Sequence, residues 1–119
     1  GSMHYYENRH KQIYDIIKAD KPLVAVPIPM TTDSWVDFKD NISMLRTYTR
    51  TIKANTSPTE AMVDTACAIF DDKYFRALSI CLVADVAHRR KNVDLEKFCL
   101  ENLPSSSYEY HWVKERCKL

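Results

Sequence analysis

Cysteine and histidine are the residue types here most suited to binding a metal or attacking a substrate, and the chain has four of each. Each cysteine is isolated in the sequence, and neither a Cys-x-x-Cys nor a His-x-x-x-His pair occurs. A zinc site made from Cys99, Cys117, His88 and His111 would depend on the fold alone to assemble it, and we predict no metal and no cofactor. The pattern instead indicates free thiols, mostly buried, in a reducing compartment. These cysteines are Cys67, Cys81, Cys99 and Cys117.

Asp85 is the carboxylate that most needs an explanation, because residues 73–89 are otherwise apolar almost all round. An ionised carboxylate in such surroundings requires a partner. His88 and Arg89 follow it at i+3 and i+4, so a local ion pair is the first interpretation. The alternative is a buried acid that receives a basic residue from a partner protein.

An enzyme is disfavoured by the lack of glycine. The one glycine, Gly1, belongs to a leader at residues 1–3 that is typical of a cloning remnant. Phosphate-cradling loops, dinucleotide-binding fingerprints and nucleophile elbows all need glycine at fixed positions. We therefore predict no catalytic residue and no small-molecule substrate, and rank a helical enzyme that uses a cysteine or Asp85 third.

Basic residues recur at helical spacing although the net charge is only +1, from 17 Lys+Arg against 16 Asp+Glu. Three cations are spaced so that they share one helix face with Thr49, which predicts an exposed basic stripe. Two further basic clusters lie near the end of the apolar segment 73–89 and within residues 108–119. If they converge, they form a patch that can contact phosphates; a solvated face is the alternative. The stripe is Arg46, Arg50 and Lys53, and the clusters are Arg89, Arg90 and Lys91 and then Lys114, Arg116 and Lys118.

Aromatic side chains near both ends and a proline-rich segment are the candidate protein-binding features. Chain termini often meet in compact domains, so the aromatic residues can form a joint surface, or else simply cap the core. The proline-rich segment either completes the core or offers a preformed extended edge. The candidate residues are Tyr5, Tyr6, Val26, Pro27, Ile28, Pro29, Tyr108, Tyr110 and Trp112.

Apolar periodicity of three and four residues predicts a single all-α domain over 4–119, a bundle of five or six helices. The expected helices are 4–19, 35–54, 58–70, 73–89, a short one that begins at Asn92 or Asp94 and stops before Pro104, and one in 108–119, after a linker at 104–107. An extended proline-rich strap should join the first two. Ser57, Pro58 and Glu60 predict a capped start for the third helix, which should bury Met62, Val63, Ala66, Ile69 and Phe70. No apolar run approaches the roughly 20 residues of a membrane helix.

These features favour a non-catalytic protein–protein interaction module, an adaptor or assembly domain of an intracellular protein that is cytoplasmic or nuclear. Its partner would be another protein or a second copy of the chain. The alternative is a helical nucleic-acid-binding domain that uses the basic stripe, with affinity that falls steeply with salt.

Overall fold

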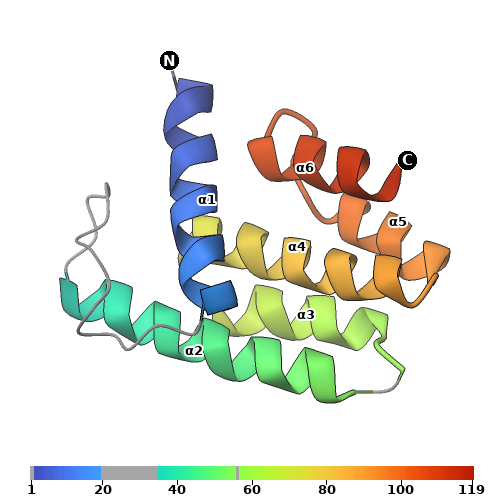
Figure 1. Ribbon diagram of the computed structural model, residues 1–119, viewed down its shortest axis with the longest axis horizontal. Helices are drawn as coiled ribbons and strands as arrows, with labels where there is room; N and C mark the ends of the chain where they lie inside the picture. The colour runs from blue at the N-terminus through green and yellow to red at the C-terminus, as the bar shows by residue number, and fades with distance from the viewer. Residues whose placement is uncertain (1, 20–34, 56) are drawn as a thin grey trace.

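The protein is all-helical in the computed structural model, which describes the backbone of residues 2–19, 35–55 and 57–119. The side chains of residues 2–6 and 35 lie outside that description. Six helices occur in the described ranges (Figure 1). They are α1 (Ser2–Ala19), α2 (Trp35–Ala54), α3 (Glu60–Ile69), α4 (Lys73–Arg89), α5 (Val93–Glu101) and α6 (Tyr108–Cys117). The predicted strap, with Val26, Pro27, Ile28 and Pro29, lies outside the described residues.

Helix α4 is the centre of the bundle. It packs against α2, α3, α5 and α6, and every residue from Leu78 to Ala87 is buried. In Figure 1, α2 and α3 lie on one side of α4, α5 and α6 lie on the other, and α1 stands across them. A helix that is surrounded by other helices has almost no face exposed to solvent, which explains why the sequence of α4 is apolar almost all round.

One hydrophobic cluster contains buried side chains from all six helices of the described ranges. The stripe predicted for α2 is buried as expected: Phe38, Ile42 and Leu45 are fully buried. Residues 104–107 form a short connection between α5 and α6, which pack together. In these described ranges, no helix combines the length and the apolar character that crossing a bilayer requires.

Side-chain caps start three of the helices. Asp72 Oδ1 accepts hydrogen bonds from the Tyr74 and Phe75 amides, at 2.7 and 3.1 Å, at the start of α4. Asn92 caps α5 and Ser107 caps α6 in the same manner. Since an N-cap oxygen satisfies amides that have no partner within the helix, these residues fix where each helix begins.

The predicted start of α3 was wrong by two residues. The helix begins at Glu60 after Thr59, whose side chain makes no capping hydrogen bond. The Ser57 amide instead donates to Asn55 Oδ1 at 2.8 Å, which closes a separate turn. Pro58 is buried, and its carbonyl accepts a 3.5 Å hydrogen bond from the Asn92 side chain. The turn and this contact with the start of α5 keep Ser57 and Pro58 outside the helix.

The predicted burial of α3 was wrong for Ile69, which is 41% exposed, and Met62 is only half-buried. Val63, Ala66 and Phe70, at spacings of three and four, are fully buried. A ten-residue helix that packs mainly on α4 can bury only one stripe. Met62 and Ile69, seven residues apart, therefore lie on the neighbouring stripe.

Lysines occupy the left-handed positions where helices commonly use glycine. Lys91, after α4, has φ 57°, and Lys118, after α6, has φ 55°. Positive φ disfavours a residue with a Cβ atom by roughly 1 kcal/mol. A domain without glycine thus ends two helices with strained residues.

Candidate functional site

An apolar groove runs between α2 and α3. It encloses about 530 Å³, and its apolar lining is formed chiefly by Met44, Tyr48, Met62 and Ile69, with threonines between them. Met44 and Ile69 are 38% and 41% exposed, two of the largest exposed apolar side chains in the described part of the chain. The Tyr48 hydroxyl donates to the Met62 carbonyl, so this ring links the two walls. Burial raises the pKa of the Tyr48 hydroxyl, which stays protonated as a donor.

Both walls of this groove arise from helical periodicity. On α2, Met44, Tyr48 and Thr51 follow one another at spacings of four and three; on α3, Met62 and Ile69 are seven residues apart. These stripes lie beside the ones that each helix buries on α4. Because the core residues face α4, the neighbouring stripes are left to line the groove.

One end of the groove is acidic. Met44 and Ile69 also line an adjoining hollow of about 460 Å³ that contains four aspartates. Asp37 and Asp40 lie on the first turns of α2, and Asp71 and Asp72 lie between α3 and α4. Asp72 is already engaged: it caps α4, and its second oxygen lies 3.7 Å from Arg9. An apolar floor that leads to carboxylates fits a ligand with an apolar face and a positive end.

The aromatic residues predicted for partner binding are only partly gathered. The Tyr108 and Trp112 rings pack against His10 of α1, with ring centroids 5.2 and 5.3 Å apart. Trp112 also lies 5.9 Å from Tyr14. Tyr110 packs on the core and on His111, and the side chains of Tyr5 and Tyr6 are outside the described residues. In the described part, these rings join α1 to α6.

His10 is buried within that aromatic cluster. Its side chain is 4% exposed, and neither ring nitrogen has a hydrogen-bond partner within the described ranges. Burial, with a smaller contribution from Lys11, lowers the pKa of His10 to about 4. The imidazole is therefore neutral at neutral pH and acts as an aromatic packing group.

The basic stripe on α2 is less exposed than predicted. Arg50 and Lys53 are exposed, whereas Arg46 is half-buried and Thr49 is buried. Thr49 donates its hydroxyl to the Leu45 carbonyl at 2.7 Å. The α2 surface that carries these residues is thus partly covered, and its exposed cations are concentrated toward the end of the helix.

The basic clusters converge in part. Lys53 of α2, Arg89 of α4 and Lys18 of α1 line one small hollow of about 30 Å³. Arg90 donates to the carbonyls of Asn55 and Lys53, which ties the end of α4 to the end of α2. Lys91 is exposed beside it. Arg90 thus stabilises the packing of α4 against α2. Lys18 is an additional cation beside Lys53 and Arg89 that the sequence pattern did not indicate.

Asp85 has an intramolecular partner that the sequence did not reveal. Arg116 of α6 donates to Asp85 Oδ1 from Nε at 2.9 Å and from Nη2 at 2.6 Å. Arg89 lies 3.5 Å from the second oxygen, as expected from its position at i+4. The local ion pair predicted from the sequence is thus made by Arg89, whereas His88, the other neighbour considered, turns toward Glu96. Arg116 fills the place that the alternative interpretation gave to a partner's basic residue.

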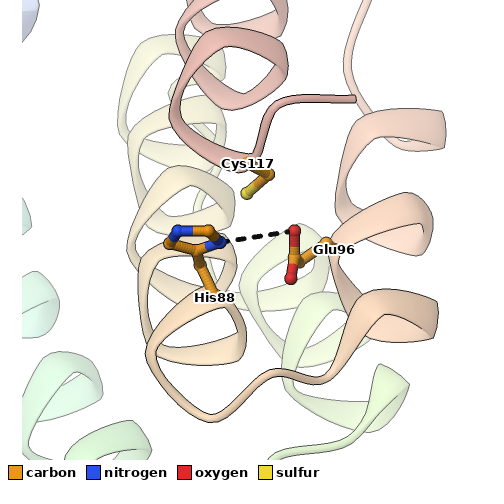
Figure 2. A group of neighbouring side chains, drawn as sticks. All are labelled: His88, Glu96 and Cys117. Carbon is orange, nitrogen blue, oxygen red and sulfur yellow. Dashed lines mark ion pairs between the residues drawn. The ribbon is translucent and has the colours of Figure 1, made fainter.

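A mixed polar cluster joins the end of α4 to α5 and α6 (Figure 2). His88 Nδ1 lies 3.6 Å from Glu96 Oε2, and the Cys117 thiol is close to both. Glu96 and Cys117 are buried, and the His88 side chain is 40% exposed. Burial, followed by a hydrogen bond to Glu96, raises the pKa of Cys117 to about 12. These three residues are of types that can hold a metal ion.

All four cysteines are free, and three of them are buried, as the sequence indicates; Cys67 is exposed. Of the zinc set considered from the sequence, the structure gathers His88 and Cys117 in one cluster. His111 is exposed and packs on Tyr110. Glu96 was missed because an acidic residue in the first turn of a helix is normally explained by the helix dipole.

Comparison of the chain with protein-family models, curated proteins and solved structures gave no match in any of the three.

Proposed function

We propose that this protein is a non-catalytic protein-interaction module whose groove between α2 and α3 binds an amphipathic helix of a partner protein, with basic residues at one end of that helix. The observation that carries the proposal is the apolar lining of Met44, Tyr48, Met62 and Ile69, continuous with four aspartates. An exposed apolar groove on a small domain commonly marks an interaction surface.

The shape and chemistry of the groove suit a helix. An amphipathic helix inserts side chains at spacings of three and four into a channel between two helices. Methionine side chains such as Met44 and Met62 are flexible and polarizable, so they adapt to partners of different shape. The aspartates at one end would attract lysine or arginine and set the direction in which the helix lies.

The proposal is tested with two labelled synthetic helices about four turns long that share one apolar stripe. One carries lysines at one end, and the other carries glutamates at the same positions. Fluorescence anisotropy should show that the lysine form binds at least about tenfold more tightly than the glutamate form at low salt. The difference in affinity should be smaller at high salt. Equal affinity for the two forms would contradict the role of the acidic end.

Variants locate the binding. Ile69→Asn should weaken binding of the lysine probe about tenfold by removing apolar contact from the groove. Val93→Asn is the matched control, because Val93 is a comparably exposed apolar residue that does not line the groove. Asp40→Asn with Asp71→Asn should abolish the charge preference while sparing the Asp72 cap. Binding that survives Ile69→Asn would overturn the proposal.

A second candidate, nucleic-acid binding, is favoured by the meeting of Lys18, Lys53 and Arg89 around one hollow. Asp85 lines the same hollow and offsets part of this charge. Anisotropy of labelled RNA and DNA over a salt series should then show affinity that falls steeply with salt and is reduced by Lys18→Ala with Lys53→Ala, but not by Lys97→Ala. Absence of binding at low salt would remove this candidate.

A further inference from the structure

We propose that His88, Glu96 and Cys117 bind a zinc ion. The three side chains come from different helices and offer one nitrogen, one oxygen and one sulfur ligand, all within 4.8 Å of one another (Figure 2). Imidazole, carboxylate and thiolate are the ligand types that zinc takes in proteins, and three protein ligands with one open position is a common arrangement. This departs from the sequence prediction of no metal.

The ligand atoms of the cluster are close enough to one another to share an ion. The 3.6 Å separation of His88 Nδ1 and Glu96 Oε2 exceeds the range of a good N–H···O hydrogen bond. Zinc placed between the ligand atoms would bond to each at about 2.0–2.3 Å, so ligand atoms already within 4.8 Å need only small side-chain rotations. The fold therefore positions the ligands before metal arrives.

Charge also favours a divalent cation. Glu96 is a buried acid, and on binding the Cys117 thiol would lose its proton to solvent as the zinc–sulfur bond forms. The thiolate and the carboxylate together would neutralise the two positive charges of zinc, and neutral His88 would complete the protein ligands. A neutral buried site avoids the large cost of an isolated buried charge. The partly exposed side of His88 leaves a position for water.

The site would have a structural effect independent of the groove between α2 and α3. Its ligands lie at the end of α4, in the first turn of α5 and at the end of α6. Zinc would thus link α6 to the α4–α5 pair, close to the Arg116–Asp85 contact that already joins α6 to α4. Binding of zinc to the folded chain alone would raise its thermal stability.

The test is a cobalt titration of the metal-free full chain, because cobalt bound by thiolate gives a charge-transfer absorption band that zinc then displaces. We expect one cobalt per chain, and a loss of affinity of about tenfold or more in His88→Gln and in Cys117→Ser. Cys67→Ser is the matched control, since Cys67 is an exposed thiol on α3. A titration without a thiolate band would overturn the proposal, as would an unchanged band in both ligand variants.

Thermal unfolding separates loss of the site from loss of the fold. Equimolar zinc should raise the Tm of the wild-type chain and of Cys67→Ser, but not that of His88→Gln. His88 is partly exposed, so metal-free His88→Gln should retain the helical circular dichroism and the Tm of the metal-free wild-type chain. If zinc raises the Tm of His88→Gln as much as that of the wild-type chain, the proposal is wrong.

Discussion

The imidazole of His10 lies between α1 and α6, enclosed by Tyr14, Tyr108 and Trp112. Its pKa is lowered from 6.5 to about 4, mainly by burial. Between these two values the unfolded chain binds a proton that the folded chain does not. The free energy of unfolding is therefore unaffected by this histidine above the unfolded pKa of 6.5. It decreases as the pH falls from 6.5 to about 4.

His10→Phe should remove that acid sensitivity. Phenylalanine keeps an aromatic ring in the cluster but cannot bind a proton, so the loss of unfolding free energy between pH 6.5 and 4 should shrink by roughly 3 kcal/mol. Burial raises the pKa of nearby Glu109, which acts in the opposite direction, so the difference between variant and wild type is the quantity to measure. Denaturation by urea at several pH values provides it. His111→Gln, at an exposed histidine, is the control, and an unchanged slope in His10→Phe would contradict the account.

Lys91 offers a second test at the residue scale. Because its φ of 57° disfavours a residue with a Cβ atom, Lys91→Gly should raise the unfolding free energy by up to about 1 kcal/mol. Lys97→Gly, in the interior of α5, should lower it by about the same amount. Chemical denaturation measures both. If the two substitutions have the same sign, the left-handed backbone at Lys91 is not the source of strain.

At the scale of the elements, the start of α4 depends on Asp72, which caps the helix and also lies 3.7 Å from Arg9 of α1. Asp72→Ala should lower the unfolding free energy by about 1–2 kcal/mol. Asp72→Asn should lower the unfolding free energy by less, because the asparagine amide oxygen can still accept the hydrogen bonds from the backbone amides at the start of α4. Asp71→Ala is the neighbouring control, since Arg76 contacts the backbone carbonyl of Asp71. Equal losses for Asp72→Ala and Asp71→Ala in thermal or urea unfolding would exclude the cap as the cause.

Most elements could be predicted from the sequence because their signals are local. Apolar spacing located α2 and α4, and the cap residues Asp72, Asn92 and Ser107 act as their types suggest. The start of α3 could not be predicted, because Pro58 is held by Asn92, which is 34 residues further along the chain. The burial of Ile69 was misjudged for a similar reason: its exposure depends on how many neighbours α3 has.

At the scale of the whole molecule, the candidate sites depend on contacts between helices that no local pattern reports. The groove joins Met44 of α2 to Ile69 of α3, and the ion pair joins Asp85 of α4 to Arg116 of α6. The sequence indicated that the Asp85 carboxylate needs a partner, and it favoured protein–protein interaction as the function of the chain. It placed the interaction surface at the aromatic ends and the strap, which stay predictions, and it did not indicate the groove.

The most direct test of the proposed interaction surface is a methyl NMR titration of the labelled full chain with the lysine-ended helical probe. The account predicts the largest shifts at the methyl groups of Met44, Met62 and Ile69, with Val93 unmoved. Saturable shifts there that require about tenfold more of the glutamate-ended probe would support a groove that binds a basic amphipathic helix. Shifts centred instead on α1 and α6, or shifts that saturate at the same concentration of both probes, would contradict it.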